Sequence, residues 1–192
     1  MIEGGVELAA ISLNEIARRA GMAKSNVYRY FETREAVLLA LVWQELQLWS
    51  EHMMATWPRP TAKRPPLDAL VRHLARTMAE RPMLCALVAA VPSVLERNLS
   101  EEAIREFKTT VLQWMRELGR FLASRVPELS AQQYAELLYD GTAVIGGLYP
   151  AAHTTEIAAR VSAEPALKPL RRDLPRDLER FLLALARDRL RP

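Results

Sequence analysis

Hydrophobic residues recur every three or four positions along most of the chain, with polar and charged residues between them. This spacing places the apolar side chains on one side of an α-helix, and no segment shows the alternation that is typical of β-strands. Capping residues, prolines and glycines at the ends of these apolar stripes divide the chain into about eight predicted helices. These cover residues 12–20, 24–31, 35–56, 66–81, 83–91, 100–125, 130–148 and 175–190. The predicted fold class is therefore all-α.

Two of these helices bear on the architecture. The helix at residues 35–56 follows a hydroxyl cap at Thr33, carries a continuous apolar stripe and would extend ~33 Å. The helix at residues 83–91 follows Pro82 and is apolar on nearly every side, which predicts that it is buried. Residues 59–66 and 150–175 are rich in proline and predict loops, the second with one helical turn near residues 155–161.

The first two predicted helices are short and are joined by a tight turn. Ser12 is a suitable N-cap for the first helix, and Glu15 stands three residues later, as in a capping box. Gly21 ends this helix, because glycine adopts the left-handed C-terminal conformation without steric cost. Residues 12–34 therefore predict a helix, a turn and a second helix.

The two faces of the second helix differ in chemistry. Val27, Tyr30 and Phe31 are available to pack on the first helix. The opposite face is polar and basic, and it carries Lys24, Ser25, Asn26, Tyr28 and Arg29. Cations bind DNA phosphates, and hydroxyl and amide groups bind phosphates or base edges, so this face has the chemistry of a DNA-reading helix. Helix pairs with a solvated basic face also occur in many other all-α proteins, and the pattern alone does not separate the two interpretations.

The residues themselves add a resemblance to a known family. The features that carry it are Ile16-Ala17, Ala20-Gly21, Tyr28, Tyr30-Phe31, Arg34 and the apolar helix from Val37 onward. Residues 16–41 closely resemble the N-terminal DNA-binding domain of the TetR family of bacterial transcriptional regulators. The remaining chain matches this family only in character.

The resemblance implies both a fold and a function. It implies an N-terminal helix-turn-helix DNA-binding head at residues 1–34, followed by a C-terminal helical bundle for ligand binding and dimerisation at residues 35–192. A long connecting helix opens the second part. The helix at residues 24–31 is expected in the major groove, where Tyr28 and Tyr30 reach phosphates or pack locally. Arg34 and the Ser12 cap are expected to clamp the DNA backbone.

The start of the chain departs from the family pattern. Family members have a full helix before the position of Ser12, whereas this chain has 11 residues there, interrupted by Gly4-Gly5. The first helix is therefore expected to be truncated, so that either the start is placed too late or the head is under-packed. This departure keeps an alternative open: a helical ligand-binding or interaction dimer with a degenerate DNA-binding head.

Positive charge is concentrated near the start of the chain. The net charge of the whole protein is +3, and residues 12–34 alone carry the same excess. A local excess matters more than the total for docking on phosphates. The sequence shows no signal peptide and no run of ~18 apolar residues that would span a bilayer, so a cytoplasmic protein without a membrane partner is expected.

Catalytic and metal-binding motifs do not occur in the sequence. It has no Gly-rich phosphate loop, no nucleophile elbow and no HExxH motif, which disfavours an all-α enzyme. His52, His73 and His153 are far apart along the chain, and neither a metal site nor a cofactor is predicted. Cys85, the single cysteine, lies in an apolar segment, which indicates a packed thiol rather than a reactive one.

The apolar stripes of the body contain Met, Trp and Tyr residues that are candidates for the wall of a ligand pocket. They are Trp49, Met53, Met78, Met83, Trp114, Met115 and Tyr139. Core packing is the simpler explanation for any one of them. The resemblance favours a cavity that binds an unknown small-molecule effector, and it implies a repressor that its effector releases from DNA.

The last long helices predict a homodimer. The helices at residues 130–148 and 175–190 are apolar enough to need partners, and Gly141 and Gly146 permit another helix to approach closely. The family also dimerises through its last two long helices. A two-fold dimer suits a palindromic double-stranded DNA operator, whose half-sites lie ~34–36 Å apart or at a multiple of that distance.

Overall fold

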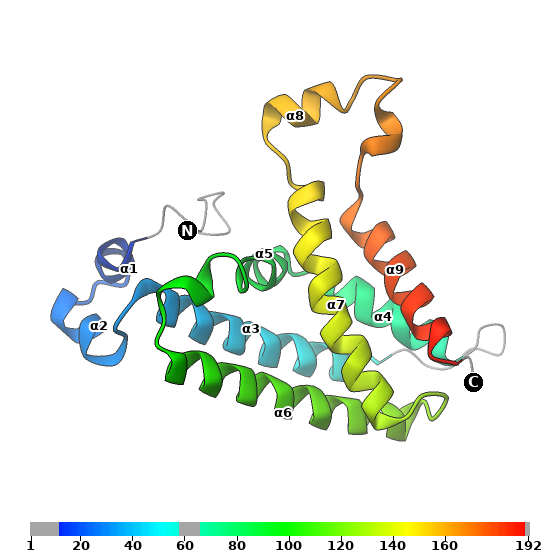
Figure 1. The fold of residues 1–192 in the computed structure, drawn as a ribbon, viewed down its shortest axis with the longest axis horizontal. Helices are drawn as coiled ribbons and strands as arrows, with labels where there is room; N and C mark the ends of the chain where they lie inside the picture. Colours follow the sequence, from blue (N-terminus) through cyan, green and yellow to red (C-terminus); the bar gives the residue numbers. More distant parts are fainter. Residues whose placement is uncertain (1–11, 58–65, 191–192) are drawn as a thin grey trace.

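The computed structural model describes residues 12–57 and 66–190 (Figure 1). Its α-helices are α1 (Leu13–Arg19), α2 (Lys24–Tyr30), α3 (Arg34–Ala55), α4 (Pro66–Ala79), α5 (Pro82–Ala90), α6 (Glu101–Arg125), α7 (Ala131–Ala152), α8 (Glu156–Val161) and α9 (Leu174–Asp188). Two short 3-10 helices are η3 (Leu95–Asn98) and η4 (Lys168–Leu170). The described residues contain no strand, which confirms the predicted all-α class. No helix among them combines the length and apolar character that crossing a bilayer requires.

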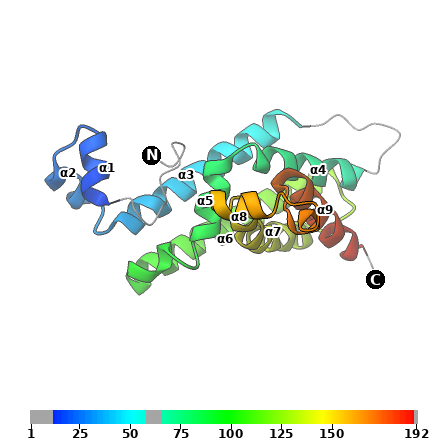
Figure 2. The same cartoon turned by 90° about the horizontal axis from the view of Figure 1, so that it is seen from above.

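A small head and a larger body lie at the two ends of α3. The head, formed by α1 and α2, projects from the rest of the molecule, and α3 leads from it into the body (Figures 1 and 2). α6 contacts α3, whereas α7 and α9 lie side by side, with α7 packed on α5 and α6 and α9 packed on α4. The expected truncated first helix at residues 1–11, and most of the loop predicted at residues 59–66, fall outside the described residues.

Two separate hydrophobic clusters hold these parts together. The small cluster contains Leu13, Ala17 and Val27, with Phe31 and Val37 packed against it. The large cluster joins α3, α4, α5, α6, α7 and α9. Val37 belongs to α3, so the connecting helix covers part of the apolar side of the head. The division of function at residue 34 stays a prediction.

The predicted caps form at the start of the helices. Backbone N–H groups donate to the hydroxyl oxygens of Thr33 and Ser100 at 3.2 Å. Ser130 accepts from the Gln133 N–H and is part of a complete capping box, because the Gln133 side chain accepts from the Ser130 N–H. Each cap satisfies an N–H group that has no partner within its helix, and thereby fixes where the helix starts.

The helix predicted to end at residue 148 continues to Ala152, with Pro150 inside it. Proline has no N–H to donate and normally disrupts the helix interior. Here it lies in the last turn, and the His153 N–H still donates to the Tyr149 carbonyl at 3.0 Å. The helical turn predicted near residues 155–161 is present as α8, and η4, which was not predicted, occupies a further part of the predicted loop.

α6 and α7 approach each other closely at Gly119, which was not among the glycines noted in the sequence. A Cβ atom on Gly119 of α6 would lie 2.4 Å from the Ala131 carbonyl oxygen and 3.1 Å from the Ala135 nitrogen, both in α7. Gly141 faces Leu182 of α9, with 3.4 Å to the leucine Cδ2 atom. A Cβ atom on Gly146 would meet nothing within 4 Å, so the predicted close approach at Gly146 is wrong within this chain.

We therefore expect Gly119→Ala to destabilise the fold. The new methyl group clashes with α7 backbone that cannot rotate away, and such overpacking costs ~1–3 kcal/mol. The free energy of unfolding, measured with urea at a fixed protein concentration, gives the effect. Gly146→Ala is the matched control: it adds the same methyl group inside a helix in open space and is expected to cost nothing or to stabilise slightly. Equal losses in both variants would contradict the observed crossing.

Candidate nucleic-acid interface and interior cavity

The turn between α1 and α2 follows from one glycine. Gly21 has φ +64°, in the left-handed region where only glycine is free of strain. The Met22 N–H donates to the Ala17 carbonyl at 3.0 Å, and the Gly21 N–H donates to the Arg18 carbonyl at 3.3 Å. This pair of hydrogen bonds is a Schellman motif, which ends α1 and turns the chain directly into α2.

The exposed face of α2 carries the predicted candidate residues. Val27 is 5% exposed and anchors α2 on α1, whereas the candidates on the other side are all exposed: Lys24, Ser25, Asn26, Tyr28, Arg29 and Tyr30. The prediction that Tyr30 packs on the first helix is wrong, because Tyr30 is 72% exposed. α2 ends at Tyr30, and the half-buried Phe31 occupies the inward position instead. The Arg29 guanidinium lies over the Tyr30 ring, 5.9 Å from its centre.

The cationic side chains of α1 form ion pairs, whereas those of α2 form none with the part of the chain that the structure describes. The Glu15 carboxylate accepts hydrogen bonds from Arg18 at 2.6 Å and from Arg19 at 2.8 Å. These bonds lower the pKa of Glu15 to about 2. They also replace the predicted capping box: the Ser12 hydroxyl accepts from the Glu15 N–H at 3.1 Å, but the Glu15 carboxylate turns to the two guanidiniums. By contrast, Lys24 and Arg29 form no ion pair within the described residues.

Arg34 is held by the start of α3. Its Nε donates to the Glu35 carboxylate at 2.7 Å, and its side chain is 27% exposed. The same carboxylate accepts from the Asn98 amide of η3 at 3.2 Å, and the hydrogen bonds of Arg34 and Asn98 help to lower the pKa of Glu35 against the effect of its burial. Arg34, Glu35 and Asn98 therefore link the beginning of the connecting helix to the body.

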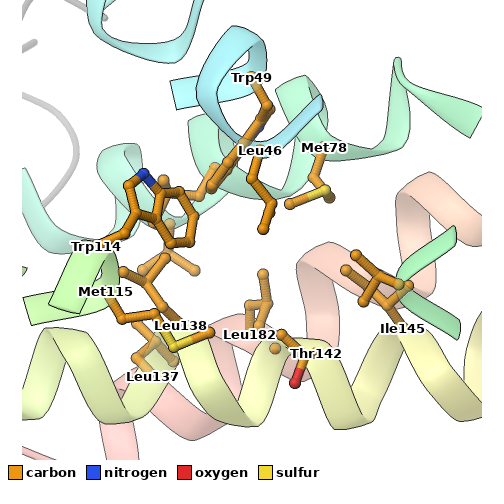
Figure 3. Close-up of a pocket in the computed structure, with 14 residues that line it drawn as sticks. Leu46, Trp49, Met78, Trp114, Met115, Leu137, Leu138, Thr142, Ile145 and Leu182 are labelled. Atoms are coloured by element: carbon orange, nitrogen blue, oxygen red, sulfur yellow. The ribbon is translucent and has the colours of Figure 1, made fainter. Parts of the chain in front are cut away.

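An interior cavity lies inside the body, between α3, α4, α5, α6, α7 and α9 (Figure 3). Its wall is almost wholly apolar and consists of Leu46, Trp49, Val71, Leu74, Met78, Val88, Trp114, Met115, Leu137, Leu138, Gly141, Thr142, Ile145 and Leu182. Four of the seven pocket candidates lie in this wall: Trp49, Met78, Trp114 and Met115. Trp49 and Trp114 meet edge to face, with 6.1 Å between their ring centres.

The other three pocket candidates lie elsewhere. Met53 is fully buried in the core, and its carbonyl accepts from His73 Nε2 at 2.9 Å. Met83 packs, half-buried, against the large cluster, and Tyr139 is 67% exposed on the outer side of α7. Sequence reasoning missed the aliphatic part of the wall, because Leu46, Leu138 and similar residues carry the same helical spacing as ordinary core positions.

The cavity is small and its polar groups are already bonded. Its volume is about 50 Å³, whereas ligand pockets usually measure ~300–1,000 Å³. The Trp49 Nε1–H donates to the Thr77 hydroxyl at 3.1 Å, and the Thr142 hydroxyl donates to the Tyr139 carbonyl at 2.7 Å. The wall therefore suits apolar groups, and a ligand of ordinary size fits only if the surrounding helices move apart.

The described residues contain no cluster of His, Cys, Asp and Glu that would hold a metal ion. Cys85 is fully buried, and its thiol donates to the Met78 carbonyl. Burial raises the pKa of this thiol to about 12, so the reactive thiolate is disfavoured.

Comparisons with known proteins cover both parts of the molecule. A family model described as "Bacterial regulatory proteins, tetR family" matches residues 6–41, and one described as "Tetracyclin repressor-like, C-terminal domain" matches residues 43–187. Two relatives from two strains of Mycobacterium tuberculosis, each named an uncharacterized HTH-type transcriptional regulator, are 41% identical over 46 residues. These matches cover 24% of the chain and 23% of each relative, so the chain spans about a quarter of the relatives that it matches.

Proposed function

The chain belongs to the TetR family of bacterial transcriptional regulators, and on this premise we propose that it is a repressor that a small-molecule effector releases from its operator. In this proposal α2 enters the major groove of DNA. Lys24 and Arg29 bind phosphates or guanine, whereas Ser25 and Asn26 bind base edges or phosphates.

The observation that carries the proposal is the difference between the cations of the two head helices. Arg18 and Arg19 both bond to the Glu15 carboxylate on α1, which offsets one of their two charges, whereas Lys24 and Arg29 are exposed on α2 without an ion pair in the described part of the chain. The larger excess of positive charge therefore lies on the helix that follows the turn. Tyr28 and Tyr30 flank it with exposed hydroxyl groups. The Ser12 and Arg34 side chains already bond within the head and α3, so we assign them supporting contacts with the DNA backbone.

A homodimer presents two such heads to DNA. α7 and α9 lie side by side, and their outer faces carry exposed small and apolar residues, including Ala143 and Gly147 on α7 and Phe181 and Ala184 on α9. Burial of these faces against a second copy would pair the two heads for a palindromic operator.

The small cavity supports release by an effector. An apolar ligand that enlarges the cavity displaces one or more of the helices in its wall; α3 is one of these helices, and it continues directly into the head. The ligand binds the enlarged state better than the contracted one, and this difference in affinity is the free energy that shifts the spacing of the two heads. Arg34, Glu35 and Asn98 couple the start of α3 to η3 and help to transmit the movement.

The salt dependence of DNA binding tests the proposed interface. Lys24 and Arg29 on phosphates in each of two heads give four phosphate contacts. A plot of the logarithm of the binding constant against the logarithm of the salt concentration is therefore expected to have a slope of about −3.5 or steeper. Gel-shift titrations of a DNA fragment selected by the purified protein, between 50 and 300 mM salt (about a six-fold range), give the slope. A slope near zero would refute phosphate contacts by this face.

A further inference from the structure

We infer that the segment between α7 and α9 is an arm that docks on a second copy of this chain, in the groove between α6 and α7 of that copy. The arm, residues 153–173, contains α8 and η4 and projects beyond the ends of α7 and α9 (Figure 1). The inference rests on the homodimer of the proposed function, and it adds the surfaces by which each copy holds the other.

The arm buries none of its helical residues in its own chain. No residue of α8 or η4 is buried, although the Thr155 hydroxyl caps α8 by accepting from the Ala158 N–H at 3.3 Å. Ile157 and Val161 are exposed one turn apart on α8, and Leu170 of η4 is 68% exposed. A helix of six residues is not stable in water by itself. The apolar side of the arm therefore indicates a surface that a partner covers.

The direction of α7 determines which part of a second copy the arm meets. Both heads of a dimer contact one DNA duplex, so the two-fold axis runs from the heads towards the bodies, the direction in which α3 leads. α3 is seen lengthwise in Figures 1 and 2, whereas α7 is foreshortened in Figure 2, so α7 runs crosswise to α3. A half-turn about the axis reverses a crosswise helix. The arm that follows the end of one α7 therefore lies beside the beginning of the partner's α7.

The beginning of α7 forms one side of a groove that suits the arm. The groove lies between α6 and α7 and measures about 720 Å³. Its lining includes Leu112 of α6 and Tyr139 of α7, two large side chains that are exposed. Gln132 and Glu136 also line it, and they continue along α7 the outer face on which Ala143 lies. A second copy that covers this face of α7 therefore extends onto the groove.

The charged side chains of the two surfaces match in sign. Arg160 stands three residues after Ile157 and so lies on the same side of α8. Arg160 and Glu136 are both exposed, and neither forms an ion pair with a described residue. On the α6 side the groove carries Arg116, which is opposite in sign to Glu156 at the start of α8. An arm with an apolar edge and both signs of charge thus meets a groove of the same composition.

Cross-linking between two introduced cysteines tests the contact directly. Ile157→Cys with Gln132→Cys places one thiol on the arm and one in the groove, beyond opposite ends of α7, whose 22 residues span ~33 Å. In the full-length protein a bismaleimide reagent is expected to join these thiols between copies and to give a covalent dimer on a denaturing gel. Wild-type protein is expected to give none, because Cys85 is buried.

The single variants and the mass in solution separate the inference from its premise. A covalent dimer from Ile157→Cys alone would place the two arms against each other, and one from Gln132→Cys alone would place the two grooves against each other. Either result would overturn docking of the arm in the groove. A dimer by analytical ultracentrifugation that gives no cross-link would overturn the arm contact and leave the homodimer in place. A monomeric wild type would overturn both.

Substitutions on the arm give a second test. Ile157→Asp with Val161→Asp is expected to raise the Kd of the dimer at least about 100-fold, because both arms lose their apolar contact. Circular dichroism is expected to be unchanged, since neither side chain is buried in its own chain. Gln44→Asp with Leu48→Asp adds two acids at the same spacing to exposed positions of α3 and is expected to change the Kd by less than about two-fold. An unchanged Kd in the arm variant, or an equal rise in this control, would overturn the inference.

Discussion

Lys24→Ala combined with Arg29→Ala is expected to abolish specific operator binding, with a loss of affinity of at least about 100-fold. A dimer carries both substitutions twice, so four contacts with DNA are removed. Both side chains are exposed on α2 and neither supports the fold, because the small cluster is built from Leu13, Ala17 and Val27. Circular dichroism and dimer mass are therefore expected to be unchanged, while gel shift shows the loss.

The matched control removes the same charge from α1. Arg18→Ala with Arg19→Ala deletes two guanidiniums that form ion pairs with Glu15 and are not assigned contacts with DNA. Its loss of affinity is expected to be less than about ten-fold. Equal losses in the two double variants would show that overall charge, and not the face of α2, determines binding.

Arg81→Met is expected to cause the largest loss of stability among single substitutions of charged residues. Glu45 on α3 is 6% exposed, and its Oε2 atom accepts from Arg81 at 2.6 and 3.2 Å. Removal of the arginine leaves a buried carboxylate unpaired, which costs ~3 kcal/mol. For a chain of this size the melting temperature is expected to fall by ~6–12 °C. The pair joins α3 to the turn before α5, next to Leu46 in the cavity wall, so the loss also loosens one side of the cavity.

Two further variants separate the charge effect from lost packing. Glu45→Gln with Arg81→Met removes the buried charge and is expected to recover more than half of the stability lost in the single variant. Arg105→Met breaks an exposed pair with Glu101 and is expected to change stability by less than ~1 kcal/mol. If the double variant is no more stable than Arg81→Met alone, the unpaired carboxylate is not the cause.

Local features of the sequence predicted local structure well. Gly21 ends α1 and adopts the left-handed conformation because the turn depends on a few adjacent residues. The caps at Thr33, Ser100 and Ser130 form for the same reason, since each involves groups three residues apart. The family could also be recognised from a short run of residues, because residues 16–41 contain the turn and the two helix faces that carry the resemblance.

Features that depend on distant residues were not predictable. Asn98 bonds to Glu35 across 63 positions in the chain, and Arg81 bonds to Glu45 across 36. Periodicity identifies Leu46 and Ile145 as buried but does not distinguish a cavity wall from a filled core. A residue in a cavity wall differs from a core residue only because no side chain from another helix packs against one side of it. The same limit applies to glycines: Gly119 touches another backbone and Gly146 touches nothing, although both interrupt similar helices.

Selection of genomic DNA fragments by the purified protein, followed by footprinting, tests most directly the central claim that α2 of two copies reads an operator. The expected result is enrichment of one short palindrome, with half-sites centred ~34–36 Å apart or at a multiple of that distance, and a footprint that the Lys24→Ala, Arg29→Ala protein does not give. Fragments that share no sequence, or a footprint that this variant still gives, would contradict the claim.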